Sequence, residues 1–172
     1  MNDTLSAVLM AKGPHPTLGR HAETYGRVIG SWKGELYDHF SGPSVQKQSV
    51  EAHFSWVLDG RAVQDVWIAP SRSERGGASA LDWYGTTLRV FDPKSESWRI
   101  VWSDPVSEHR IELEGRRRGD DVVQLGLRGG RPIRWVFTEI SGDAFRWQGH
   151  VLDYDGVTWR LEVDIHFRRA GQ

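Results

Sequence analysis

The sequence predicts an all-β protein: a closed antiparallel up-and-down barrel of about eight to ten strands, preceded by a short helix. Three observations support this fold class. Apolar and polar residues alternate with a period of two from Gly30 onward. Turn-forming pairs such as Asp59-Gly60 and Asp155-Gly156 separate the alternating segments at hairpin-sized spacings. The gaps contain no convincing crossover helix, which favours consecutive hairpins over βαβ units.

The beginning of the chain is organised differently. The segment Gly13-Pro14-His15-Pro16 interrupts any early helix, so we expect residues 1–16 to form a flexible arm. A short helix is expected from Thr17 to about Ile29. Its apolar stripe consists of Leu18, Ala22, Tyr25 and Ile29. Residues 17–172 contain no internal repeat or linker, and we predict that they form a single barrel domain.

Ten segments have the alternation expected of strands. They cover residues 31–39, 46–58, 62–69, 83–91, 98–104, 107–117, 122–128, 132–140, 144–153 and 157–168. An open sheet would leave two edges available for association, and closure into a barrel removes both of them. A sandwich of two packed sheets stays open as the structural alternative.

The last strand indicates which face points into the barrel. One face carries Trp159, Leu161, Val163, Ile165 and Phe167, and the other carries Thr158, Arg160, Glu162, Asp164, His166 and Arg168. The apolar face is expected to point inward and the charged face toward water. The same alternation in neighbouring strands assigns most of the nine tryptophans to the interior. The sequence therefore predicts an aromatic barrel interior.

Composition excludes several classes of function. The net charge is −1, from 22 basic and 23 acidic residues, so nothing favours nucleic acid or an anionic membrane as a partner. The chain has no cysteine, which removes disulfides, thiolate chemistry and cysteine metal sites. The sequence shows neither a signal peptide nor an apolar run of membrane-spanning length, and we expect a cytoplasmic protein.

Motifs for metals and cofactors are missing from the sequence. It contains no HExxH, no histidine pair at metal spacing, no phosphate-binding loop and no dinucleotide fingerprint. His53, His150 and His166 fall on predicted outward faces, where they could not ligate a haem inside the barrel. We therefore expect neither a metal nor a cofactor.

Several sequence blocks resemble a known family. Gly30-Ser31-Trp32, which opens the first strand, is similar to the Gly-x-Trp signature of lipocalins and related calycin barrels. More specific blocks are Leu58–Trp67, Tyr84–Arg89 with Asp92-Pro93, Trp98–Trp102, Arg134–Ile140 and Thr158–Glu162. Over residues 20–169, roughly, the chain resembles a group of bacterial lipocalin-like proteins carried as a domain of unknown function.

This resemblance implies a calycin-type barrel that is open at one end. In such a barrel Trp32 would have a structural role at the closed end. The resemblance supplies no catalytic residues. The extracellular transport role of secreted lipocalins is not implied, because this chain lacks the cysteines that those proteins commonly use.

Aromatic residues on the inward face are the candidate ligand-binding residues. They are Trp56, Trp67, Trp102, Trp135, Trp147, Phe54 and Phe137. Many rigid, flat rings are difficult to pack without leaving a void, which favours a cavity. Our leading hypothesis is that the barrel binds a small apolar or aromatic molecule. The alternative is a structural or interaction protein in which these rings only fill the core.

Three polar residues on the predicted inward face are candidates for acid–base catalysis: His109, Asp65 and Tyr84. Burial of a polar group costs free energy unless the group has a partner or a use. Together they could serve a cofactor-free isomerase, cyclase or hydrolase. The competing interpretation places His109 in water near a strand end and pairs Asp65 with Arg61 or Arg89.

Residues 70–80 are rich in polar residues typical of flexible loops, and they interrupt the tight series of hairpins. Long loops in compact domains often act as lids, and Arg72 and Arg75 could screen an anionic group of a ligand at the barrel mouth. A disordered tip is the alternative. The expected partner is a small hydrophobic molecule, and a homodimer is left open.

Overall fold

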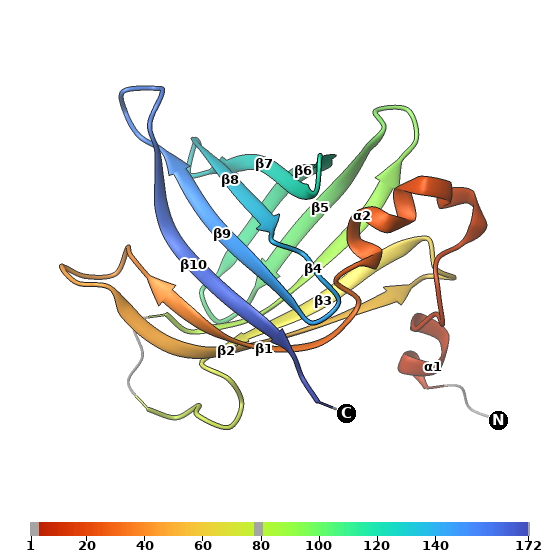
Figure 1. The fold of residues 1–172 in the computed structure, drawn as a ribbon, viewed down its shortest axis with the longest axis horizontal. Helices are drawn as coiled ribbons and strands as arrows, with labels where there is room; N and C mark the ends of the chain where they lie inside the picture. Colours follow the sequence, from red (N-terminus) through yellow and green to blue (C-terminus); the bar gives the residue numbers. More distant parts are fainter. Residues whose placement is uncertain (1–3, 78–80, 172) are drawn as a thin grey trace.

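The protein is a ten-stranded antiparallel barrel in which each strand pairs with its neighbours in the sequence (Figure 1). The computed structural model describes residues 4–77 and 81–171. The strands are β1 Gly30–Asp38, β2 Gln46–Val57, β3 Ala62–Ala69, β4 Trp83–Asp92, β5 Ser97–Asp104, β6 His109–Arg118, β7 Asp121–Arg128, β8 Arg131–Thr138, β9 Ala144–Leu152 and β10 Trp159–Arg169. All ten predicted segments are strands.

Pairing of the first and last strands closes the barrel. β1 and β10 are antiparallel, with a register that runs from Trp32 opposite Arg169 to Asp38 opposite Val163. The closed barrel with a short helix is therefore confirmed, and the two-sheet sandwich is excluded. In the described part of the chain, no helix is both long enough and apolar enough to cross a membrane.

The expected helix over residues 17–29 is shorter and less regular than predicted. It consists of a 3₁₀ segment, η1 Pro16–Ala22, followed by one α-helical turn, α2 Glu23–Gly26. Gly19 interrupts the helical backbone with a φ of 51°, a left-handed conformation that glycine adopts at little cost. Leu18 and Tyr25 of the predicted stripe are buried, so the apolar face was identified correctly.

The segment before η1 contacts the barrel. It contains the helix α1 Leu5–Leu9. Three backbone hydrogen bonds join the segment to the end of β2 and the turn that follows: Ala11 N to Trp56 O at 2.8 Å, Leu58 N to Leu9 O at 2.9 Å, and His15 N to Gly60 O at 2.9 Å. The flexibility of residues 1–16 and the single-domain organisation stay predictions.

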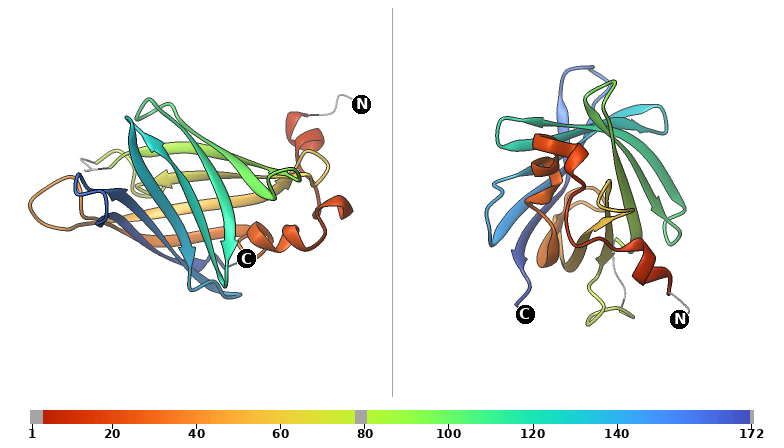
Figure 2. Two further views of the ribbon diagram at one scale, coloured as in Figure 1. Left: turned by 90° about the horizontal axis from the view of Figure 1, so that it is seen from above. Right: turned by 90° about the vertical axis from the view of Figure 1, so that its right-hand side faces the viewer.

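One end of the barrel is closed by η1 and α2, while the β1–β2 connection lies at the other end (Figure 2). Trp32 is fully buried at the closed end, where its Nε1 donates to Val28 O at 2.8 Å. The guanidinium of Arg169 lies 4.1 Å from the centroid of the Trp32 ring. A second contact at this end joins the end of α2 to the β6–β7 turn, where Arg27 Nη2 donates to Asp120 O at 2.9 Å. Trp32 therefore has the structural role that the resemblance implies.

A β-bulge in β10 reverses the predicted orientation of its first residues. The register against β9 shifts between Leu161 and Val163, which places Leu161 opposite His150 of the outer face. Trp159 lies outside as well, with the guanidinium of Arg134 4.6 Å from its ring centroid. The predictions that Trp159 and Leu161 point inward and Glu162 outward are therefore wrong. An extra residue in one strand exchanges the two faces beyond it.

Candidate functional site

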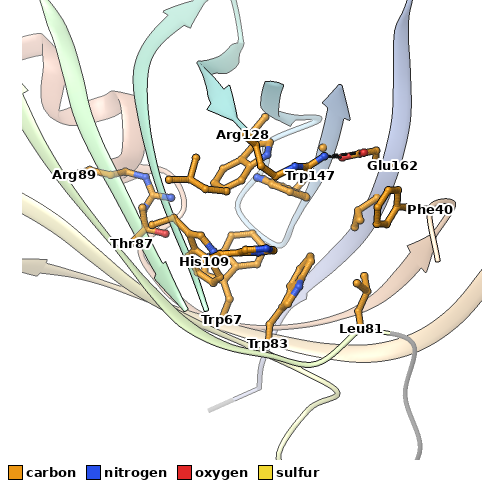
Figure 3. A pocket seen from close by; sticks show the side chains of 15 residues that line it. Phe40, Trp67, Leu81, Trp83, Thr87, Arg89, His109, Arg128, Trp147 and Glu162 are labelled. Carbon is orange, nitrogen blue, oxygen red and sulfur yellow. Dashed lines mark hydrogen bonds and ion pairs between the residues drawn. The ribbon is translucent and has the colours of Figure 1, made fainter. Parts of the chain in front are cut away.

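The barrel encloses a cavity, here called the lumen, at the end opposite α2 (Figure 3). The space that it leaves for water-sized molecules is about 130 Å³. The apolar part of its wall consists of Phe40, Trp67, Leu81, Trp83, Trp102, Ile111, Trp135, Trp147, Gly149 and Val163. The polar part consists of Thr87, Arg89, His109, Arg128 and Glu162. A small, largely apolar cavity with a few polar groups is typical of a ligand site.

Four of the predicted tryptophans, Trp67, Trp102, Trp135 and Trp147, line the lumen together. Their rings contact one another in series: the Trp67–Trp147 and Trp135–Trp147 centroids are 5.5 Å apart, and the Trp102–Trp135 centroids are 6.5 Å apart. Tilted and edge-on contacts of this kind are favourable for aromatic pairs. The wall is therefore a connected set of indoles contributed by four different strands.

Two glycines on the inner face make room for these indoles. A Cβ at Gly85 would stand 2.4 Å from Cη2 of Trp102, so the ring lies directly against the backbone of β4. A Cβ at Gly149 would stand 3.0 Å from Cη2 of Trp147. Glycine at these two positions therefore lets the indoles approach the backbone of the barrel wall more closely than a larger residue would.

The remaining predicted aromatic residues, Trp56, Phe54 and Phe137, are buried below the lumen rather than in its wall. The ring centroids of Phe54 and Phe137 are 6.1 Å apart. Trp56 lies near the closed end, beside Gly26 of α2. Alternation correctly placed these three side chains inside the barrel, but it does not report depth along the barrel axis.

A buried ion pair between Asp65 and Arg89 forms the floor of the lumen. The side chains are 0% and 2% exposed, and Arg89 Nη1 pairs with Asp65 Oδ2. Asp65 Oδ1 accepts a hydrogen bond from Thr87 N at 2.8 Å, while Gln124 Oε1 accepts from Arg89 Nε at 3.3 Å and from Tyr25 OH at 2.9 Å. Burial raises the pKa of the Tyr25 phenol, because the charged phenolate is disfavoured away from water. The competing interpretation of Asp65, pairing with Arg89, is confirmed.

The three candidate catalytic residues are not brought together. His109 lines the lumen near its mouth, at the beginning of β6. Asp65 is held by Arg89 and the backbone of Thr87. Tyr84 points outward, is 42% exposed and has the guanidinium of Arg75 5.4 Å from its ring centroid.

The prediction that Tyr84 points inward is therefore wrong. Trp83, Gly85, Thr87 and Arg89 share the inner face of β4, and three of these four residues are small or polar. The apolar residues Tyr84, Leu88 and Val90 share the outer face. Polarity alone was a misleading signal here, because the interior polar residues serve the ion pair on the lumen floor.

The Arg128–Glu162 ion pair at the mouth was not identified from the sequence. Arg128 Nη2 donates to both carboxylate oxygens of Glu162, at 2.8 and 2.6 Å (Figure 3). The side chain of Glu162 is only 6% exposed. Glu162 reaches the lumen because of the bulge in β10, which local sequence does not reveal. Trp83 was also missed, although it shares the inner face with Gly85.

The arginines of the predicted lid lie outside the lumen. Arg72 Nε donates to Glu51 Oε1 on the outer face of β2 at 2.7 Å. Arg75 Nη2 donates to Asp82 Oδ1 at 2.5 Å and its Nη1 to Trp83 O at 3.1 Å. Both arginines therefore tie the loop to neighbouring strands. The last part of the predicted loop, residues 78–80, lies outside the described residues.

The Arg72–Glu51 pair predicts a pH-dependent stability. The hydrogen bond from Arg72 lowers the pKa of Glu51 from 4.5 to about 2, so the pair stabilises the folded state above pH 4.5. This contribution should decrease as the pH falls toward 2. We expect Arg72→Met to destabilise the protein at pH 7 and to have a smaller effect at pH 3, measured by urea unfolding. Arg110→Met, which removes an exposed pair with Glu112, is the matched control. An equal loss of unfolding free energy at pH 7 and at pH 3 would contradict the prediction.

Comparison with known proteins identifies the fold. No protein-family model and no curated protein matches the sequence. The S-type phycobiliprotein lyase CPES from Guillardia theta superimposes with a TM-score of 0.59 at 10% identity, over 88% of this chain and 93% of that chain. Rv2717c from M. tuberculosis superimposes with a TM-score of 0.59 at 12% identity, over 92% of this chain and 99% of that chain. At these identities the similarity shows the fold alone, which is a calycin-like antiparallel barrel.

Proposed function

We propose that this protein binds a small apolar or aromatic molecule in the lumen. The observation that carries this proposal is the set of five tryptophans, Trp67, Trp83, Trp102, Trp135 and Trp147, around a cavity of about 130 Å³. A core that only needed filling would not keep such a space between rigid rings. Because the indoles pack against one another and against the backbone at Gly85 and Gly149, little ordering is required when a ligand enters.

The fold comparison fits this function in general terms, since one of the similar structures is named a phycobiliprotein lyase. We further propose that the chain is a cytoplasmic member of the bacterial lipocalin-like group that its sequence blocks resemble. The ligand, rather than another macromolecule, is the proposed partner.

A ligand titration tests the proposal. We expect small aromatic compounds such as 2-acetylnaphthalene to quench the intrinsic fluorescence, because the lumen tryptophans contact the ligand. A compound that is polar throughout, such as glucose, should leave the emission unchanged. Quenching should saturate at one ligand per chain, and calorimetry should report the same affinity. The absence of saturable binding by any aromatic compound would refute the proposal.

An enzymatic function in the same lumen is the second candidate. The observation that favours it is the position of His109, a titratable side chain, in the lumen wall. A cofactor-free isomerase, cyclase or hydrolase would need such a group within reach of the reacting atom. Ligand binding requires only a complementary shape and one or two orienting hydrogen bonds. It explains more of the residues that line the lumen than catalysis by His109 does.

A further inference from the structure

The lumen presents indole N–H groups that have no acceptor. Trp67, Trp102 and Trp147 are 5%, 7% and 6% exposed, and no hydrogen bond joins their Nε1 atoms to another of the residues that the structure describes. Unlike Nε1 of Trp98, these three nitrogens are not fully buried, and their residues line the lumen. The same holds for Trp83 and Trp135, which are partly exposed to the lumen. An indole N–H that a ligand covers loses its access to water and then needs an acceptor from the ligand. The wall of the lumen is therefore rich in unused donors.

The carboxylate of the lumen wall, Glu162, and the one that pairs with Arg89, Asp65, are already engaged. Glu162 accepts two hydrogen bonds from Arg128, and Asp65 is held by Arg89 and by the backbone of Thr87. In both ion pairs the carboxylate oxygens contact an arginine, and they accept no hydrogen bond from the indoles. An oxygen atom of a ligand would therefore supply an acceptor that the wall lacks.

The charge balance of the lumen distinguishes between ligand classes. Arg89 is paired with Asp65 and Arg128 with Glu162, so the charges at the floor and at the mouth cancel. His109 lies at the exposed rim. A carboxylate in the lumen would be a buried charge without a counterion, which is costly. A carbonyl oxygen can accept an indole hydrogen bond without bringing a net charge.

We propose that the lumen binds uncharged, planar aromatic carbonyl compounds. The rings pack between the lumen tryptophans, and the carbonyl oxygen accepts a hydrogen bond from at least one indole N–H. This inference rests on the proposed function and specifies its ligand class. It differs from a purely hydrophobic site, which would favour a hydrocarbon because a carbonyl group loses hydration on entry.

Three naphthalenes of matched shape test this proposal in the intact protein. They are 2-acetylnaphthalene, 2-isopropylnaphthalene and 2-naphthoate, with affinities measured by calorimetry. We expect the ketone to bind about tenfold more tightly than the hydrocarbon, and the carboxylate to bind no better than the hydrocarbon. Tightest binding by the hydrocarbon or by the carboxylate would overturn the ligand class while leaving the proposed function intact. Failure of all three to bind would overturn both.

Indole resonances locate the interaction. In a ¹⁵N–¹H correlation spectrum, the ketone should shift the Nε1–H signals of lumen tryptophans downfield, as expected for new hydrogen bonds. Trp32 Nε1 already donates to Val28 O at 2.8 Å, and Trp98 Nε1 is buried outside the lumen wall, so both signals serve as internal controls. The hydrocarbon should not produce the downfield ¹⁵N shifts. Shifts confined to the two control residues would overturn the proposal.

Discussion

Replacement of Arg89 by methionine should lower the free energy of unfolding by about 3–5 kcal/mol. The substitution leaves the Asp65 carboxylate, which is fully buried, without its counterion. It also removes the hydrogen bond to Gln124 and the guanidinium that lies 4.8 Å from the ring centroid of Tyr25. Urea unfolding at neutral pH, followed by tryptophan fluorescence, measures this loss.

Two variants separate the buried charge from other effects of the Arg89 substitution. Arg99→Met removes a pair with Asp92 in which the arginine is 75% exposed, and it should cost less than about 1 kcal/mol. The double variant Arg89→Met/Asp65→Leu removes both charges and should be more stable than Arg89→Met alone. If Arg89→Met costs no more than Arg99→Met, the buried pair does not contribute as the structure indicates.

Replacement of Ile111 by tryptophan should abolish ligand binding. Ile111 is 5% exposed and lines the lumen, so a larger side chain at this position would occupy the space of the ligand. We expect the affinity for 2-acetylnaphthalene, measured by calorimetry, to fall by more than about a hundredfold. Overpacking should lower the free energy of unfolding of this variant by roughly 1–3 kcal/mol, which urea unfolding would measure.

Leu125→Trp is the matched control for this experiment. Leu125 lies on the outer face of β7 and is 50% exposed, so the same substitution there adds an indole without entering the barrel. This variant should bind ligand as the unmodified protein does. Binding that survives Ile111→Trp would place the ligand site elsewhere and would contradict the proposed function.

Local alternation was sufficient to predict the strands and most inward-facing side chains. Phe167 and Ile165 of β10 illustrate this, because both are buried as expected. Each depends only on the period-two geometry of its own strand. Tyr84 shows where the same reasoning fails: the outer face of β4 is the more apolar one, because the inner face carries Arg89 for its partner Asp65. That pairing joins two strands and has no local signal.

The sequence by itself determined where the strands lie, their hairpin connections and the aromatic character of the interior. These properties follow from backbone alternation and turn chemistry, which act over a few residues. Only the tertiary structure decided which indoles line the lumen and which lie beneath it. That division depends on the register around the whole barrel, as does the bulge that turns Glu162 toward Arg128. Contacts between distant strands decide the register, so the site could not be predicted from segments taken singly.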